Sequence, residues 1–458
     1  MIEPPHAVAR ARVLEMIDAL APRLVGAVTE LIRVPSVSPT YPGCVYEELV
    51  GGEKAANERL APLYAEAGAE LTWLEPVPGR ANLLGLVRGA GGEGARSLAL
   101  NGHIDTVPFG DPAKWRGGEP CSGRIVDGRV YGRGASDQKG GLVATAMAAI
   151  ALRRSGVRLA GDLVMESTCG EEVGDHEAGI TPLVAAYRAD GVVITEPTAP
   201  VTADPANPPH GLLVCPVTAG LLWMTLEVEG KVGHNNLRPE LVRAGGVGPA
   251  AGVNAIEKGV YLLNRLQDLE QQWGQSYLHP LFKPGHFSLH PGVIVGGPHG
   301  ALVPFFSSEF CRIEYSILYP PQVGAEPIKR EIEAFVQDAS RLDPWLREHP
   351  AQITWNLDWP PAVLDATHPL TQTLARARRE ALGEAAWAGP EADPRIRGFD
   401  AVCHATTFMA AGMPAVICGP GSIQFAHAVD ESVGVEELVR AAKLYALAAM
   451  DWCGVAVA

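Results

Sequence analysis

The 458-residue chain lacks three features that would each point to a particular class of protein. No apolar stretch is long enough to cross a membrane, so we expect no membrane-spanning segment. Acidic residues outnumber basic ones by 52 to 37, and the net charge of −15 offers no basic surface for nucleic acid. The eight cysteines are scattered singly, without a C-x-x-C pair, which favours a reduced protein over a disulfide framework.

The opening residues, Met1-Ile-Glu-Pro-Pro-His6, lack the basic start and apolar stretch of a signal peptide. We therefore expect the protein to be cytoplasmic. A hydrophobic content of 47% with 19% charged residues is typical of a packed globular protein. Because a chain of this length is too long for one hydrophobic core, two domains are expected.

The order of apolar patterns predicts an α/β catalytic domain, in which strands alternate with helices that cover both faces of a sheet. Helical spacing covers 7–32, 53–67 and 141–153. Compact apolar runs typical of buried strands occupy 82–87, 97–104, 162–167, 191–195 and 414–418. Asp127-Gly128 between two short apolar runs predicts a hairpin.

The pattern changes after Pro209. Residues 221–228 and 310–318 alternate apolar and polar side chains, with a helical segment at 253–269 between them. Such alternation is typical of sheets with one face exposed. The stretch 284–300, rich in His, Gly and Pro, predicts a long loop. We therefore expect a smaller α+β domain inserted into the larger one, with boundaries at 1–212, 213–323 and 324–458.

Five side chains that suit divalent cations stand beside predicted strand ends or before a predicted helix: His103, Asp137, Glu172, Glu196 and His427. Imidazole and carboxylate groups bind zinc and similar metals well. Taken alone, Asp137 is explained equally well as a cap of the following helix, and a lone histidine such as His427 is more often structural. Five such residues in matching positions predict a metal site and metal-assisted hydrolysis.

Glu171 precedes Glu172 at the end of the run 162–167. Adjacent carboxylates at a strand end usually belong to a solvated turn. The functional interpretation is that one carboxylate binds metal while the other faces the reacting water.

The chain resembles the co-catalytic zinc hydrolases that include acetylornithine deacetylase, succinyl-diaminopimelate desuccinylase, aminoacylase and glutamate carboxypeptidase. The resemblance spans nearly the whole chain in order. Its segments are Gly102-His-Ile-Asp-Thr-Val107, Asp127-Gly-Arg-Val-Tyr-Gly-Arg-Gly-Ala-Ser-Asp-Gln-Lys-Gly-Gly141, Glu171-Glu-Val-Gly174, Ile194-Thr-Glu-Pro197, Val232-Gly-His234, Asn254-Ala-Ile256, Gly296-Gly297 and Gly419-Pro-Gly421 with His427 and Glu431.

The resemblance implies a zinc-peptidase-like catalytic domain that binds two Zn²⁺ ions per subunit. It implies that Asp137 bridges the ions, that His103 and Glu196 complete one shell, and that Glu172 and His427 complete the other. The same ligands also suit Co²⁺ or Mn²⁺.

The remaining roles also come from the resemblance. Asp105 orients the ring of His103, and Glu171 is the general base for the water that bridges the ions. His234 reaches the active site of a partner subunit to stabilise the oxyanion, and Asn254 and Gly421 bind the substrate. The inserted domain is then a lid through which a homodimer forms.

One feature of the family is absent. Many members have an arginine in the last strand of the inserted domain that binds a substrate carboxylate, and alignment on Pro320-Pro321 places it at Ile317 or Leu318. Arg312 lies too early in the strand. Because an arginine fork is the natural partner of a carboxylate, its absence argues against an ordinary N-acyl amino acid or peptide C-terminus as substrate.

Three functions compete at this point. The leading hypothesis is an amidohydrolase that cleaves an N-acyl bond of a small molecule. The second is a dipeptidase or carboxypeptidase of the same family, which needs an anchor for the substrate terminus. The third is an inactive relative that acts as a binding protein, and the presence of Glu171 with five intact ligands argues against it.

Overall fold

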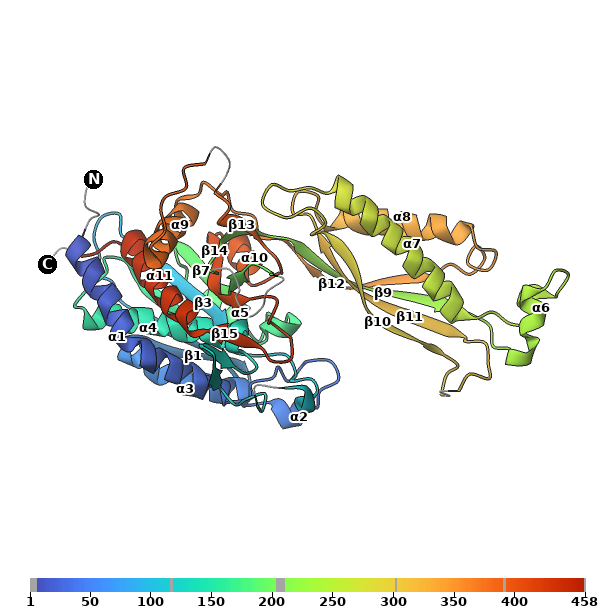
Figure 1. Ribbon diagram of the computed structural model, residues 1–458, viewed down its shortest axis with the longest axis horizontal. Helices are drawn as coiled ribbons and strands as arrows, with labels where there is room; N and C mark the ends of the chain where they lie inside the picture. The colour runs from blue at the N-terminus through green and yellow to red at the C-terminus, as the bar shows by residue number, and fades with distance from the viewer. Residues whose placement is uncertain (1–5, 116–117, 203–210, 301–302, 390–392, 457–458) are drawn as a thin grey trace. The chain divides into compact units, whose positions relative to one another are not determined.

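A computed structural model describes residues 6–115, 118–202, 211–300, 303–389 and 393–456. The chain divides into a larger unit, residues 1–217 with 363–458, and a smaller unit, residues 218–362 (Figure 1). The larger unit confirms the expected α/β class, because it contains a mixed sheet flanked by helices.

The main sheet of the larger unit has the strand order β1-β2-β6-β3-β7-β14-β8-β13. The strands are β1 (Glu70–Val77), β2 (Arg80–Val87), β3 (Leu98–His103), β6 (Leu163–Thr168), β7 (Gly191–Ala199), β8 (Val214–Thr218), β13 (Ile396–Phe399) and β14 (Ala415–Ser422). β6, β3, β7 and β14 run parallel to their neighbours in this group, whereas β1, β2 and β8 pair antiparallel. Every residue of β3, β6, β7 and β14 is buried, which explains their continuous apolar runs.

Helices surround this sheet, and α4 is buried along almost its whole length. The helices are α1 (Ala7–Ile32), α2 (Tyr46–Leu49), α3 (Gly52–Glu66), α4 (Gly140–Arg154), α5 (Ile180–Ala186), α9 (Pro369–Leu382), α10 (Ala405–Ala410) and α11 (Val435–Cys453). α4 packs against α1, α3 and α11, and its many alanines allow this close approach (Figure 1). Among the residues that the structure describes, no helix combines the length and apolar character needed to span a bilayer.

A small second sheet lies in the larger unit and joins distant parts of the chain. It consists of β4 (Arg124–Val126), β5 (Arg129–Tyr131) and β15 (Ser432–Gly434), with β5 in the middle. The predicted hairpin at Asp127-Gly128 is confirmed: both residues have positive φ, and β4 pairs antiparallel with β5. β15 brings the segment that follows His427 next to the segment that precedes Asp137.

The smaller unit has a four-stranded antiparallel sheet in the order β10-β11-β9-β12. Its strands are β9 (Gly220–Glu229), β10 (Ser288–Gly297), β11 (Phe310–Tyr319) and β12 (Gln352–Trp359), and its helices are α6 (Arg238–Val242), α7 (Ala255–Ser276) and α8 (Ala325–Arg341). Burial alternates along β11, because one face of the sheet is covered and the other is open.

Two sequence predictions for this unit differ from the structure. The expected segment 213–323 ends too early, because β12 pairs with β9 and extends the unit to residue 362. The predicted loop at 284–300 contains the strand β10. Pro291 is accommodated there because β10 is an outer strand and its register shifts between Pro291 and Val293.

Lys139 connects the end of α1 to the loop that carries Asp137. Its side chain is buried, and its ammonium group donates hydrogen bonds to the carbonyls of Leu31 at 3.3 Å and Val34 at 2.8 Å. A cation at the C-terminus of a helix satisfies carbonyls that lack a partner within the helix.

We predict that Lys139→Met lowers the free energy of unfolding by about 1–3 kcal/mol, because it leaves buried carbonyls without their donor. Urea denaturation measures the change. Lys54→Met is the control, since Lys54 lies in a solvent-exposed ion pair with Glu75 and its loss should change the free energy of unfolding far less. An equal effect of both substitutions would contradict the proposed role of Lys139.

Candidate metal centre and active site

The predicted ligands meet at the carboxyl ends of the central parallel strands. His103 is the last residue of β3, Glu172 lies in a short turn after β6, Glu196 lies within β7, and His427 follows β14. Because β6, β3, β7 and β14 are parallel neighbours, their carboxyl ends lie at one edge of the sheet. Asp137 joins them from the irregular segment between β5 and α4.

Asp137 lies between two groups of side chains, and each of its carboxylate oxygens faces a different histidine. Oδ1 lies 2.8 Å from Nε2 of His103, and Oδ2 lies 3.4 Å from Nε2 of His427. Nε2 of His103 lies 3.6 Å from Glu196, and Nε2 of His427 lies 2.9 Å from Glu172. Asp137 thus lies between the pair His103 and Glu196 and the pair His427 and Glu172, and the role of these side chains as metal ligands stays a prediction.

Glu171 lies beside these groups. Its Oε2 is 4.0 Å from Nε2 of His103. Potential ligand atoms of His103, Glu171 and Glu196 lie within 4.8 Å of one another, and so do those of His103, Asp137 and Glu172. The carboxylate of Glu171 thus borders the space between the groups, as a base for a reacting water requires.

The buried negative charge of the site favours the binding of cations. The carboxylates of Asp105, Asp137, Glu171, Glu172 and Glu196 gather around two imidazoles, and all but Glu172 are among the buried residues. The pKa of Glu171 is raised to about 8, mainly by burial; His103 opposes this shift, and the nearby carboxylates add to it. Burial also raises the pKa of Glu196. Uncompensated buried charge is costly, and this mixed oxygen and imidazole set fits divalent ions such as zinc, cobalt or manganese.

Known proteins resemble this chain over most of its length. Residues 99–451 match the family described as Peptidase family M20/M25/M40. The chain belongs to this family. It is therefore a hydrolase of amide or peptide bonds, and the resemblance inferred from its motifs is confirmed.

Among relatives, the chain is 28% identical to N-formyl-4-amino-5-aminomethyl-2-methylpyrimidine deformylase of Halalkalibacterium halodurans, over 96% of each chain. It is 28% identical to acetylornithine deacetylase of Myxococcus xanthus, over 96% of this chain and 100% of that one. Among solved structures, human carnosine dipeptidase 1 matches with a TM-score of 0.69 and 17% identity, over 98% of this chain and all of that one. The last match shows the fold alone.

Asp105 supports the site differently from the sequence expectation. The Nδ1 atom of His103 lies 2.9 Å from the backbone carbonyl of Asp105, whereas the nearer carboxylate oxygen is 3.7 Å away. The carboxylate instead accepts hydrogen bonds from the N–H groups of Glu171 and Glu172, at 3.1 Å each. Asp105 therefore contacts the ring through its backbone and holds the base and a ligand through its side chain.

Gln138 is a contact residue that the sequence did not single out. Its side-chain N–H donates to Glu196, and its carbonyl oxygen accepts from the hydroxyl of Thr195 at 2.7 Å. A Cβ at Gly102 would lie 2.6 Å from this oxygen, so only glycine fits beside it.

The three residues predicted to act on the substrate, His234, Asn254 and Gly421, have local structural roles. His234 accepts a hydrogen bond from the N–H of Asn236 at 3.1 Å, and Asn254 caps α7 by accepting from the N–H of Ile256 at 3.1 Å. Gly421 has a φ of 95°, and a Cβ there would lie 2.1 Å from the hydroxyl of Ser136. Roles of His234, Asn254 and Gly421 toward the substrate stay predictions.

The two positions proposed for the missing arginine lie on opposite faces of β11. Ile317 is fully buried on the covered face, so an arginine there would meet the core. Leu318 is on the open face and half-buried. Arg312 shares this face, but its guanidinium is paired with Glu314. Of the two positions, Leu318 is therefore the one with access to solvent, and its correspondence to a carboxylate anchor stays a prediction.

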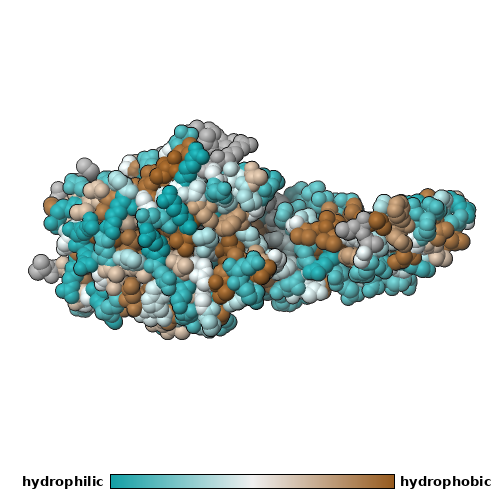
Figure 2. All heavy atoms as spheres, turned by 90° about the horizontal axis from the view of Figure 1, so that it is seen from below, coloured by the Kyte–Doolittle hydropathy of each residue, from teal (hydrophilic) through white to brown (hydrophobic). Residues whose placement is uncertain are grey.

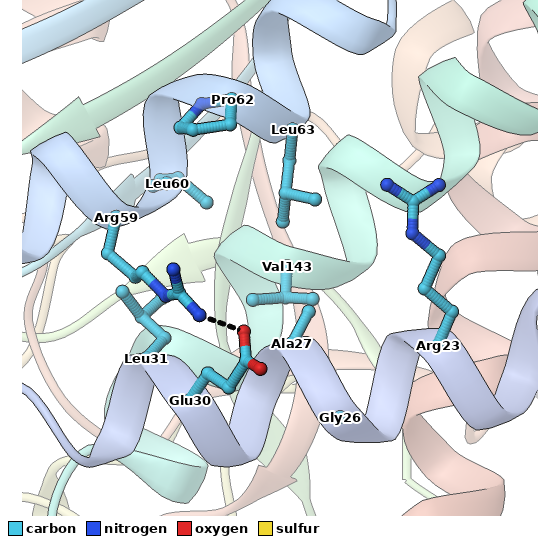
Figure 3. A pocket seen from close by; sticks show the side chains of 10 residues that line it. All are labelled: Arg23, Gly26, Ala27, Glu30, Leu31, Arg59, Leu60, Pro62, Leu63 and Val143. Carbon is cyan, nitrogen blue, oxygen red and sulfur yellow. Dashed lines mark hydrogen bonds and ion pairs between the residues drawn. The ribbon is translucent and has the colours of Figure 1, made fainter.

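A separate cavity of about 360 Å³ lies between α1, α3 and α4 and contains none of the candidate ligands (Figure 3). Leu60, Leu63 and Val143 line it, and Arg59 pairs with Glu30 at one side. The arginines that line it are already paired, Arg59 with Glu30 and Arg23 with Glu66.

We predict that zinc binding releases protons and strengthens as the pH rises from about 6 to 8. Partial burial opposes the shift, but Asp137 and Glu172 together raise the pKa of His427 to about 11, and this imidazole must be neutral to bind metal. Calorimetric titration in two buffers with different protonation enthalpies measures the protons released.

His427→Gln is the control for this titration, because it removes one of the protons and should reduce the number released. A zinc affinity that is independent of pH would contradict the prediction.

Proposed function

We propose that the protein is a metal-dependent amidohydrolase that cleaves an N-acyl bond of a small molecule. The observation that carries the proposal is the shared position of Asp137, whose two oxygens each face one histidine. Glu196 accompanies His103 and Glu172 accompanies His427, so two ions would have matching ligand sets. Zinc is the first candidate, and cobalt or manganese would suit the same ligands.

Two bound ions would polarise the substrate carbonyl and lower the pKa of the attacking water. The carboxylate of Glu171 then takes a proton from the water through Oε2. Burial raises the pKa of Glu171 in the absence of metal, and two bound cations would favour its ionised form, so that it can accept this proton. Glu171 passes the proton to the amine nitrogen as the C–N bond breaks, so that a carboxylic acid and a free amine result.

The proposed substrate is an N-formyl or other short N-acyl amide of a neutral heteroaromatic amine. Two features support it. The open face of β11 has Leu318 where many family members have a carboxylate-binding arginine. The relative in Halalkalibacterium halodurans is named for deformylation of an aminomethylpyrimidine, whose name contains no carboxylate.

A dipeptidase or carboxypeptidase is the second candidate. The fold of carnosine dipeptidase supports it only at the level of architecture, since the identity is 17%. Such an enzyme needs an anchor for the peptide terminus, and Arg312 is paired with Glu314. The third candidate, an inactive binding protein, has no chemical need for Glu171.

The function is tested by measuring amine release by the zinc-loaded protein from matched amides. We predict that N-formyl-4-amino-5-aminomethyl-2-methylpyrimidine has a kcat/KM at least about tenfold above that of N-formyl or N-acetyl amino acids. The reason is that a carboxylate would meet an apolar side chain at Leu318. Preference for the amino acid derivatives would favour the deacylase or peptidase alternative.

Glu171→Gln is the control, because it preserves the size of the side chain and removes the base. It should bind the same number of ions but lower kcat by at least about 100-fold. Equal rates for both proteins would indicate that Glu171 is not the base. A fully loaded parent protein that hydrolyses none of the amides would favour the inactive alternative.

We further propose a homodimer that forms through the smaller unit. β10 is an outer strand, and Val293, Ile294 and Val295 are each about half exposed. Ile256 and Val260 of α7 extend the apolar surface, since Ile256 lies against Gly296 of β10. Hydrophobic surface is visible on this unit in Figure 2. An outer strand with an apolar surface suits pairing with a second copy.

We predict that Ile294→Lys converts the dimer into a monomer of 48.4 kDa, as measured by light scattering after gel filtration. A lysine on an outer strand opposes pairing with another strand. Ile125→Lys is the matched control, because Ile125 is equally exposed but lies in the larger unit. Dissociation by both substitutions, or by neither, would contradict the proposed interface.

A cytoplasmic location is proposed as well. The eight cysteines form no disulfide bonds, and six of them are buried. Free buried thiols are typical of proteins from reducing compartments.

A further inference from the structure

Glu431 is fully buried, and its carboxylate accepts four hydrogen bonds from a single loop. Oε1 accepts from the N–H groups of Ser136 at 2.9 Å and Asp137 at 3.0 Å. Oε2 accepts from the N–H of Gly134 at 3.1 Å and from the guanidinium of Arg133 at 2.8 Å. The backbone angles of Asp137, φ −125° and ψ 90°, are not helical, so its N–H cannot be satisfied by a regular helical hydrogen bond. The carboxylate of Glu431 accepts that hydrogen bond instead.

Arg133, the partner of Glu431, also donates hydrogen bonds to two further loops. Its side chain is 3% exposed. Besides Glu431, its guanidinium donates to the carbonyl of Ala428 at 3.2 Å and to that of Pro108 at 3.2 Å. Ala428 follows His427 directly, and Pro108 belongs to the loop after β3. One buried ion pair therefore joins the three loops that surround the candidate centre.

The two histidines depend on this contact to different degrees. His103 ends a central strand, is 1% exposed, and has its Nδ1 atom 2.9 Å from the carbonyl of Asp105. The side chain of His427 is 56% exposed. The ring contacts of His427 that the structure shows are to Asp137 and Glu172, which are themselves candidate ligands. The position of His427 is thus set by the backbone of its loop.

We propose that Glu431, paired with Arg133, is a positioning residue for the second ion, the one assigned to Asp137, Glu172 and His427. The pair fixes the backbone of Asp137 and the loop of His427 at the distance at which both can bind one ion. The first ion, assigned to His103 and Glu196 with Asp137, depends less on the pair, because β3 and β7 supply these two ligands. The inference rests on the proposed two-ion function.

Cobalt titration of the metal-free protein tests the proposal, with calorimetry and the visible absorption of bound cobalt as readouts. Glu431→Gln keeps the shape of the side chain but removes the charge that Arg133 neutralises. We expect the second binding constant to fall by at least about tenfold, while the first changes by less than about twofold. Equal weakening of both ions, or unchanged binding of both, would overturn the proposal.

Glu380→Gln is the matched control, because Glu380 pairs with the buried Arg10 far along the sequence from every candidate ligand. It should leave both binding constants unchanged. If Glu431→Gln does not fold, Arg133→Lys supplies the test: it keeps a cation beside Glu431 but cannot reach both carbonyls. Arg133→Lys should lower the binding constant of the second ion several-fold and leave that of the first ion unchanged. Unchanged binding of both ions would again overturn the proposal.

The titration of the parent protein separates this inference from the function on which it rests. If the parent binds one ion, the two-ion function fails. If the parent binds two ions and Glu431→Gln binds both equally well, only the role of Glu431 fails.

Discussion

The concentration of buried carboxylates at one edge of the main sheet is the constraint on which the site depends. Asp105, Asp137, Glu171 and Glu196 are buried within reach of a single imidazole, His103. Carboxylates so placed repel one another, and their desolvation is costly unless cations or hydrogen bonds compensate. The parallel strands and their loops hold the carboxylates in place, and the same repulsion that opposes folding favours the binding of divalent ions.

Hydrogen bonds from residues outside the candidate ligand set keep these groups in position. Gln138 contacts Glu196, the carboxylate of Asp105 holds the turn of Glu171, and Glu431 holds the loop of Asp137. Such contacts fix the orientation of ligands and commonly affect metal affinity as strongly as a ligand change does. They also explain why the irregular segment that follows β5 can be both non-helical and buried.

In the proposed function, the smaller unit bears on the choice of substrate. Its β11 presents Leu318 and Arg312 on the open face, and Arg312 is already paired with Glu314. The proposed preference for neutral substrates follows from this apolar side chain, because a desolvated carboxylate would lack a cationic partner there. The similarity to a protein named as a pyrimidine deformylase agrees with the proposed preference, whereas another similar protein is named acetylornithine deacetylase.

The sequence by itself determined the central strands, the hairpin at Asp127-Gly128, helix α1 and the family, because apolar periodicity and glycine-rich motifs are local signals. It did not determine β10, since Pro291 is tolerated only in an outer strand, and strand order is a tertiary property. The pairing of β12 with β9, and hence the limit of the smaller unit, was hidden for the same reason.

For the site as well, the sequence determined some features and the tertiary structure others. The residue types of His103, Asp137, Glu172, Glu196 and His427 are visible in the sequence. Only the tertiary structure showed that each oxygen of Asp137 faces a different histidine, that Asp105 turns its carboxylate toward the N–H groups of Glu171 and Glu172, and that Arg133 joins three loops. Sequence separations such as the 298 residues between Arg133 and Glu431 carry no distance information, because the fold alone brings such residues into contact.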